Sequence, residues 1–277
     1  MRALVLAYHS HNIAGYEYHN NDHVAFSQDL VALTDVGARL VALDSIVAAH
    51  RASIIDDSPS EIAVALTFDD GPVFDVLDFE DRRHGPQRSF LNVMFDFASK
   101  SHGKQPDLQG TSFVIASREA RAAMEADRDC GFTDQGHWLT DSWWPTAQGS
   151  NLLRLGNHSW DHVHPAPREI ATKSTARGNF ATVDNYEDAN SEIRDAGRFI
   201  EAVSGAPCKY FAYPYGHTND YLTQDYLPAH QSEHGLAAAF TTEGRRVRSS
   251  DSIWTIPRAV CGHHWRSPEE LHNILFD

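Results

Sequence analysis

The sequence is poor in the residues on which several classes of protein depend. Its 277 residues include three cysteines, widely spaced, which are too few for a disulfide framework and favour a reducing compartment. Lysine and arginine number 23 against 38 aspartates and glutamates, so the formal net charge is −15 at pH 7. Nucleic acids and anionic membrane surfaces would repel such a chain, and we expect neither as a partner.

Long apolar runs and phosphate-binding motifs are also missing. No apolar stretch approaches the roughly 20 residues that span a bilayer. The apolar opening, residues 1–8, is only as long as a strand and lacks the cleavage site of a signal peptide. We therefore expect a cytoplasmic protein without a membrane span, although a trimmed exported chain would share these features. Neither a glycine-rich phosphate loop nor a Cys-x-x-Cys pair occurs, which disfavours a nucleotide enzyme.

Aspartate and histidine occur in two short motifs that follow apolar runs. The first, residues 67–72 (Thr-Phe-Asp-Asp-Gly-Pro), ends an apolar run from Ile62 that predicts a buried strand followed by a turn. The second, residues 157–162 (Asn-His-Ser-Trp-Asp-His), follows the short apolar run 152–156. Active sites of α/β folds are assembled at the carboxyl ends of such strands, so we expect the two motifs to meet there.

The residue types in these motifs suit a catalytic metal site. His158 and His162 are four residues apart, so one turn of chain can direct both rings at one ion. One aspartate with two histidines leaves a position on a tetrahedral ion open for water, and a neighbouring aspartate stays free to act as a base. Taken separately, Asp69 with Asp70 fits a solvated turn, and the histidines fit a surface pair. Together they favour a metal-dependent hydrolase.

These motifs resemble those of the polysaccharide deacetylases, the NodB-homology or carbohydrate esterase family 4 enzymes. Thr-Phe-Asp-Asp-Gly and His-Ser-x-x-His look like the first two family motifs, and residues 210–216 (Tyr-Phe-Ala-Tyr-Pro-Tyr-Gly) look like the third, in the style of the poly-N-acetylglucosamine deacetylases. The resemblance implies an α/β fold, a deformed (β/α) barrel that forms a single domain over residues 1–277 with a motif-bearing core of about 61–265. It also implies an acetylated oligo- or polysaccharide substrate, N-acetylated rather than O-acetylated.

The resemblance further implies a role for each motif residue. Asp69 corresponds to the catalytic base, and Asp70, His158 and His162 correspond to the metal ligands. Zinc is the expected ion, although cobalt and nickel also suit one aspartate with two histidines. The expected reaction is hydrolysis of the acetyl group by a water activated at the metal, with Asp69 taking the proton.

Residues of the third motif are expected to bind substrate. By resemblance, the backbone N–H of Tyr215 helps to hold the oxyanion, and Tyr213, Pro214 and Tyr215 form one side of the sugar groove. We also expect His9, at the end of the first predicted strand, to line the site. Trp143 or Trp144, in a long loop, is a candidate for stacking on a sugar ring, and packing over the hydrophobic core is the alternative.

Two positions depart from the family pattern. The third motif of the family usually begins with an arginine that pairs with the catalytic aspartate, and here Ala212 takes that position. We hypothesise that Arg258 supplies the charge instead. The late histidine that protonates the leaving amine is not marked by a clear Leu-x-His motif, and the candidates are His263, His264 and His272. We favour His264 or His263, which come just after the predicted strand 253–260, because His272 lies on a predicted C-terminal helix.

Strands and helices are predicted to alternate along the chain, as a barrel requires. Strands are expected at 2–7, 39–43, 62–68, 111–115, 210–213, 236–240 and 253–256, and helices at 24–35, 90–99, 118–127 and 185–203, with others from 45 and from 268.

Two other functions stay open at this point. One is hydrolysis of a small non-sugar amide or imide, against which the intact pair of Asp69 and Asp70 counts. The other is a glycan-binding protein that holds a metal without turnover, which the departure at Ala212 allows. The presence of Asp69 disfavours it, because binding alone needs no base.

Overall fold

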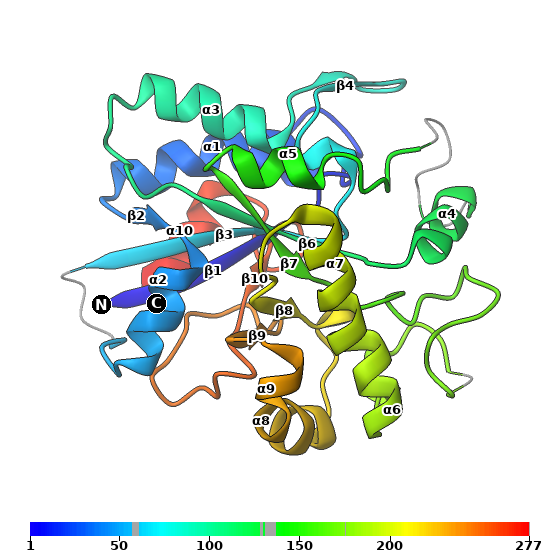
Figure 1. Ribbon diagram of the computed structural model, residues 1–277. Helices are drawn as coiled ribbons and strands as arrows, with labels where there is room; N and C mark the ends of the chain where they lie inside the picture. Colours follow the sequence, from blue (N-terminus) through cyan, green and yellow to red (C-terminus); the bar gives the residue numbers. More distant parts are fainter. Residues whose placement is uncertain (57–60, 128–129, 131–136, 175, 277) are drawn as a thin grey trace.

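Parallel strands surrounded by helices form the centre of the protein. The computed structural model (Figure 1) describes residues 1–56, 61–127, 130, 137–174 and 176–276. The strands of the main sheet are β1 (Arg2–Tyr8), β2 (Arg39–Val41), β3 (Ile62–Phe68), β6 (Gly110–Val114), β7 (Leu153–Asn157), β8 (Tyr210–Ala212), β9 (Ala238–Phe240) and β10 (Ala259–Val260). They follow the order β10-β1-β3-β6-β7-β8-β9, with β2 also paired to β3, and every pairing is parallel.

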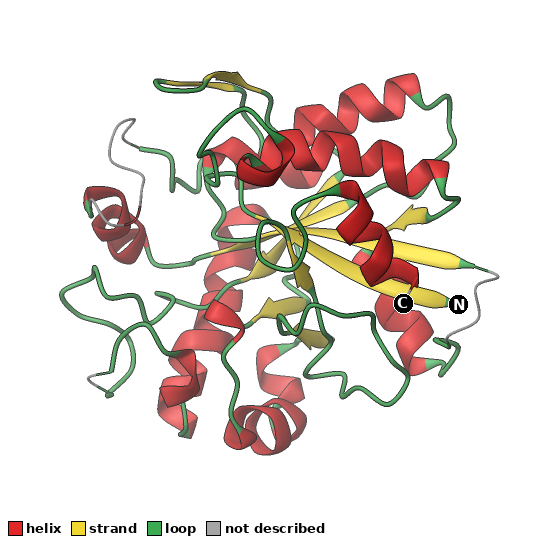
Figure 2. Ribbon diagram, turned by 180° about the vertical axis from the view of Figure 1, so that it is seen from behind, coloured by secondary structure: helices red, strands yellow, loops and turns green. Residues whose placement is uncertain are grey.

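Helices surround this sheet, as the view from behind shows (Figure 2). The α-helices are α1 (Asp22–Asp35), α2 (Leu43–Arg51), α3 (Phe90–Lys100), α4 (Arg118–Ala126), α5 (Trp144–Gly149), α6 (Tyr186–Ala189), α7 (Ala196–Ser204), α8 (Leu227–Ala229), α9 (Gln231–His234) and α10 (Pro268–Phe276). Two π-helical segments are η5 (Asn190–Asp195) and η7 (Tyr221–Tyr226). The short 3-10 segments are η1 (Tyr18–Asn20), η2 (Val73–Asp75), η4 (Phe180–Thr182) and η6 (Pro214–Gly216), and β4 (Phe79–Asp81) pairs with β5 (Gly85–Gln87) in a separate antiparallel hairpin.

A short late segment closes the sheet into a deformed barrel. The Ile256 N–H donates to the Ala239 carbonyl at 3.0 Å, on the β9 side, and the Cys261 N–H donates to the Ala7 carbonyl at 2.9 Å, on the β1 side. The residues between them therefore join the two edges of the sheet. The expected deformed (β/α) barrel is confirmed.

Successive side chains of a strand point to opposite faces of the sheet, so the two faces pack into two separate hydrophobic clusters. In β1, Leu4 and Leu6 pack outward into the layer that contains α1, α3 and α10, whereas Ala3 and Val5 belong to a second cluster shared by β2, β3, β8 and β9. This second cluster contains many alanines, and small side chains let the strands curl around a narrow interior. Gly156 also leaves space in the interior, because a Cβ there would lie 2.5 Å from the Phe113 ring.

Most predicted elements are present, with two differences. The segment 253–256 is not a strand: it forms a turn with one bridge to Phe240, and the strand follows later as β10. The predicted helix 185–203 is interrupted by η5, so the helix widens for six residues between α6 and α7. No helix in the described part of the chain is long and apolar enough to cross a membrane.

Candidate active site

The carboxyl ends of the strands surround a cavity of about 610 Å³. This is the edge at which the two sequence motifs were expected to meet. The lining residues follow β1, β3, β7, β8 and β10, and they include His9, His11, Asp69, Asp70, His158, His162, Tyr213, Tyr215 and His263. A cavity of this size lies within the range of typical small-molecule sites.

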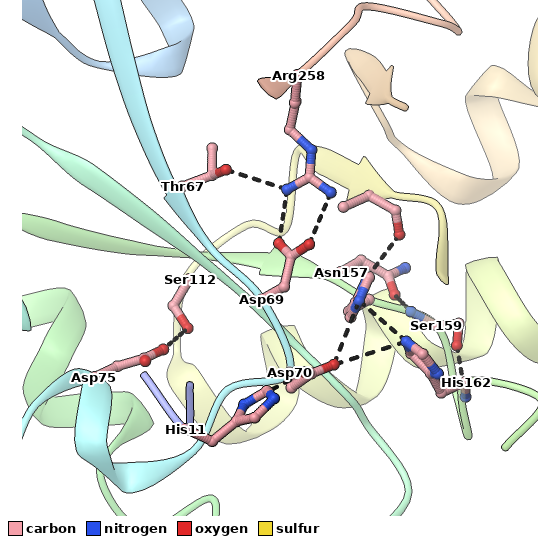
Figure 3. Close-up of polar contacts among 12 residues, drawn as sticks. His11, Thr67, Asp69, Asp70, Asp75, Ser112, Asn157, Ser159, His162 and Arg258 are labelled. Atoms are coloured by element: carbon pink, nitrogen blue, oxygen red, sulfur yellow. Dashed lines mark hydrogen bonds and ion pairs between the residues drawn. The ribbon is translucent and has the colours of Figure 1, made fainter. Parts of the chain in front are cut away.

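Three predicted metal ligands converge within this cavity. Figure 3 shows two of them, Asp70 and His162, directed toward each other. Asp70 Oδ1 lies 3.6 Å from His158 Nε2 and 3.7 Å from His162 Nε2, and the two imidazole nitrogens are 3.3 Å apart. Ligand bonds of about 2.1 Å around a tetrahedral zinc ion separate the ligand atoms by about 3.4 Å. The three side chains therefore fit a zinc ion by both chemistry and spacing. Among the residues that the structure describes, no other group of histidine, cysteine, aspartate and glutamate fits a metal in this way.

A backbone contact orients one of these rings. His158 Nδ1 lies 2.9 Å from the Ala212 carbonyl oxygen, and an N–H there donates to that oxygen. Its Nε2 then keeps a free lone pair directed at Asp70 and His162, the arrangement that outer contacts give to metal-binding histidines. Ala212 thus takes part in the site through its backbone.

The turn after β3 separates the two aspartates. Asp70 and Gly71 have φ values of 71° and 69°, in the left-handed region. A Cβ at position 71 would lie 2.5 Å from the Val114 side chain, so only glycine fits there. Because the chain bends at this point, Asp70 is directed toward the histidines while Asp69 is directed toward Arg258 (Figure 3).

Asp69 is held by a buried arginine. Arg258 is fully buried, and its Nη1 and Nη2 donate to the two carboxylate oxygens of Asp69 at 2.7 and 2.8 Å. It also donates to Thr67 Oγ1 at 3.1 Å and to the Thr241 carbonyl at 3.2 Å, and its guanidinium carbon lies 5.2 Å from the centre of the Phe113 ring. Arg258 thus lies where the sequence hypothesis required a substitute for the arginine missing at position 212.

This ion pair fixes the charge of Asp69. Burial is the largest single influence on the pKa of this carboxyl group and raises it, but the charge and hydrogen bonds of Arg258 together with the nearby His158 and His9 outweigh that effect, so the pKa of Asp69 falls below its usual range. Asp69 is therefore ionised throughout the neutral range, with one face on the cavity and the other on Arg258.

Two histidines from the loop after β1 lie beside the three predicted metal ligands. His9 lines the cavity as expected. His11 Nδ1 lies 3.7 Å from Asp70 Oδ2, and burial lowers the pKa of His11 to about 4 despite this carboxylate. His11 is thus a neutral neighbour of the site.

The two candidates for the general acid differ in position. His263 is exposed and lines the cavity. His264 turns away, because its Nδ1 accepts the Val260 N–H at 2.9 Å and its ring packs against Gly244. The geometry favours His263, and its role stays a prediction.

In the third motif, Tyr215 is the most accessible residue. It is 40% exposed, has a left-handed φ of 59°, and its ring centre lies 4.3 Å from that of His162. Tyr213 also borders the cavity, but its hydroxyl is buried and donates to the Trp254 carbonyl at 2.9 Å. Pro214 is buried and is not among the lining residues, so it supports the turn rather than the groove surface.

The expectation that Trp143 or Trp144 forms a sugar subsite is wrong. Their exposed fractions are 5% and 0%, and both belong to the core cluster shared with the sheet and α7. Trp144 packs between Arg121, whose guanidinium carbon lies 5.1 Å from the ring centre, and Phe199. The pair covers the hydrophobic core beneath α5, which leaves no ring face for a sugar.

Comparisons with known proteins agree with this geometry. Residues 56–230 match the family model described as polysaccharide deacetylase. A comparison with curated proteins found no match.

Several solved structures have a similar fold. One is the Streptococcus pyogenes deacetylase PplD in complex with acetate, with a TM-score of 0.60 and 17% identity over 99% of this chain and 98% of that one. IcaB from Ammonifex degensii has a TM-score of 0.62 and 18% identity over 100% and 97% of the two chains. A de-N-acetylase from Aggregatibacter actinomycetemcomitans has a TM-score of 0.61 and 15% identity over 99% and 100%. Since the family match spans more than half of the chain, this protein belongs to the polysaccharide deacetylase family.

Proposed function

We propose that the protein removes acetyl groups from N-acetylated sugars of an oligo- or polysaccharide in a metal-dependent hydrolysis. The observation on which this rests is the placement of Asp69, clamped by Arg258, directly beside the set of Asp70, His158 and His162 within one cavity. An ion-binding set with an ionised carboxylate next to it is what hydrolysis of an amide by water requires.

Each of these residues has a chemical task. Asp70, His158 and His162 would hold zinc, which when bound polarises a carbonyl and lowers the pKa of water from 15.7 toward about 7. Asp69 accepts the proton of the attacking water, because Arg258 keeps this carboxylate ionised and fixes its orientation. Arg258 has both of its terminal nitrogens on Asp69, so its task is to position the base.

The remaining steps need a donor for the oxyanion and an acid for the amine. Tyr215 lies against His162, where its backbone N–H is the candidate donor to the oxyanion. His263 approaches from the end of β10 and is the candidate that protonates the leaving amine. The amide C–N bond then breaks, and acetate and a free amino sugar leave. At a net charge of −15, the protein does not repel this cationic product.

The similar structures support an acetyl substrate. Three of them are a deacetylase in complex with acetate, IcaB and a de-N-acetylase, and all three share this fold over nearly the whole chain. The intact Asp69 favours turnover over simple glycan binding, since binding alone has no use for an ionised, clamped carboxylate.

Acetate release from a panel of N-acetylglucosamine oligomers and from acetylated xylan tests the proposal. With zinc supplied, the wild type should release acetate from the N-acetylated oligomers, and D69N and H162A should not. D44N is the matched control, because Asp44 is an exposed carboxylate paired with Lys209 away from the site, and it should keep full activity. Release from xylan alone would contradict the N-acetyl assignment. Release by D69N equal to that of the wild type would contradict the assigned base.

A further inference from the structure

Glu192 is a buried acidic residue with an unusual set of contacts. It lies in the π-helical segment η5 and is fully buried. Its Oε2 accepts the backbone N–H of Trp160 at 3.2 Å and that of Asp161 at 3.3 Å. These two residues lie between His158 and His162 in sequence, so one carboxylate oxygen holds the middle of the loop that presents both histidines.

The backbone of that loop adopts unfavourable conformations that depend on contacts with the rest of the protein. Ser159, His162 and Val163 have φ values of 71°, 64° and 47°, all in the left-handed region, and for the β-branched Val163 this is a true outlier. Such residues persist only where the surrounding contacts over-determine them, and they cluster at functional sites. Within the loop, the Ser159 hydroxyl accepts the His162 N–H at 2.8 Å, and Asp161 Oδ1 accepts the Val163 N–H at 2.9 Å.

The same π-helical segment also holds the start of the loop. The Ile193 carbonyl accepts a hydrogen bond from Asn157 Nδ2 at 2.7 Å, and Asn157 Oδ1 accepts the Ser159 N–H at 2.8 Å. Asn157 ends β7 and directly precedes His158. Two neighbouring residues of η5 therefore secure the chain on either side of His158. These contacts also explain why the helix widens at η5. π-bulges are frequent at functional sites, and this one brings Glu192 and Ile193 to the loop.

We infer that Glu192 is a positioning residue of the metal site, which sets the histidine loop through its hydrogen bonds to the Trp160 and Asp161 amides. The inference rests on the proposed metal-binding role of His158 and His162. The two amides need a hydrogen-bond acceptor at this place, and the acceptor need not carry a negative charge. The Asp161 carboxyl group and the Ser159 hydroxyl also interact with the Glu192 side chain, and the nearby Asp161 disfavours a second negative charge here. Glutamine supplies that acceptor and leucine does not.

The test is the zinc dissociation constant, measured by competition with a chromophoric chelator, for the wild type, E192L and E192Q. Loss of an outer contact to metal ligands typically weakens metal binding about 10–100-fold, and we expect the zinc dissociation constant of E192L to rise by a factor in that range. E192Q should bind zinc nearly as tightly as the wild type. Y226F is the matched control, because its hydroxyl donates to Asn190 Oδ1 at 2.9 Å in the same segment and does not bond to the histidine loop. Its zinc affinity should be unchanged.

Two results would overturn the inference. One is a zinc affinity of E192L equal to that of Y226F. The other is an equal loss in E192Q and E192L, which would show that the charge or the side-chain volume matters instead of the acceptor. If E192L does not fold, E192D replaces it: the shorter side chain withdraws the oxygen from both amides, and zinc binding should again weaken. Zinc affinity is measured without turnover, so the two proposals can fail separately. If E192L binds zinc more weakly but the zinc-loaded wild type releases no acetate, the proposed function is refuted and this inference stands.

Discussion

Replacing Arg258 with methionine is expected to destabilise the metal-free protein by about 3–5 kcal/mol, the usual cost of removing one partner of a buried ion pair. Both members are buried, with exposed fractions of 0% for Arg258 and 4% for Asp69, so solvent does not screen the charge left behind. Methionine fills much of the space beside the Phe113 ring, which keeps the cavity term small. The Thr241 carbonyl also loses its hydrogen bond from Arg258 Nε.

The expected loss depends on pH in a definite direction. The pKa of Asp69 is lowered in the folded protein, so its contribution to stability is present above its unfolded value of 3.8 and is lost as the pH falls through the lower folded value. Without Arg258 the buried carboxyl takes up a proton more readily. The difference in unfolding free energy between the wild type and R258M should therefore shrink as the pH is lowered from 7 to 4.

Urea denaturation with a chelator present measures these quantities, and a double-mutant cycle with D69N identifies their cause. In the D69N background the removal of Arg258 leaves no buried negative charge, so it should cost less than in the wild type. The reasoning would be refuted if R258M lost under about 1 kcal/mol, as expected of an exposed pair. Equal losses in the two backgrounds would refute it as well.

Three further substitutions test other parts of the structure. Burial raises the pKa of Asp75 from 3.8 to about 7, so between these two values the folded chain keeps a proton that the unfolded chain releases. Stability should therefore fall by up to about 1.4 kcal/mol per pH unit as the pH rises toward 7, and level off above it. Asp75→Asn should remove this slope in urea denaturation at pH 5–8, and an unchanged slope would contradict the assignment. Trp144→Ala should cost about 3–5 kcal/mol in unfolding free energy and leave KM unaltered, whereas a raised KM in a stable variant would restore the sugar subsite. Gly156→Ala places a Cβ 2.5 Å from Phe113 and should cost about 1–3 kcal/mol, while Gly149→Ala, which meets nothing within 4 Å, should cost none; equal urea midpoints for the two would be inconsistent with this packing.

The candidate metal ligands and the proposed base could be predicted from the sequence because strand ends are local features. The apolar run Ile62–Phe68 matches β3 residue for residue, and the turn that follows places Asp69 and Asp70 at the sheet edge. The ends of parallel strands meet in space, so the histidines after β7 necessarily lie on the same side. Arg258 could be predicted as well, because Ala212 leaves the expected partner of Asp69 missing and a late arginine can replace it.

Other features depend on contacts between distant segments. The sequence 185–203 has ordinary helical periodicity, and nothing local marks the widened turn η5 or the task of Glu192. Tryptophans such as Trp143 and Trp144 often stack on sugar rings, and only the packing of α5 on α7 shows that both side chains lie in the hydrophobic core. The segment 253–256 has strand composition but contributes a single bridge, because the barrel closes through β10.

The most direct test of the proposed metal-dependent deacetylase is a zinc titration of the metal-free protein, with acetate release from an N-acetylglucosamine oligomer as the readout. The account predicts no release without metal, a rise that reaches its plateau at one zinc per chain, and no rise in H162A. Full release from the metal-free protein, or none with one zinc bound per chain, would contradict it.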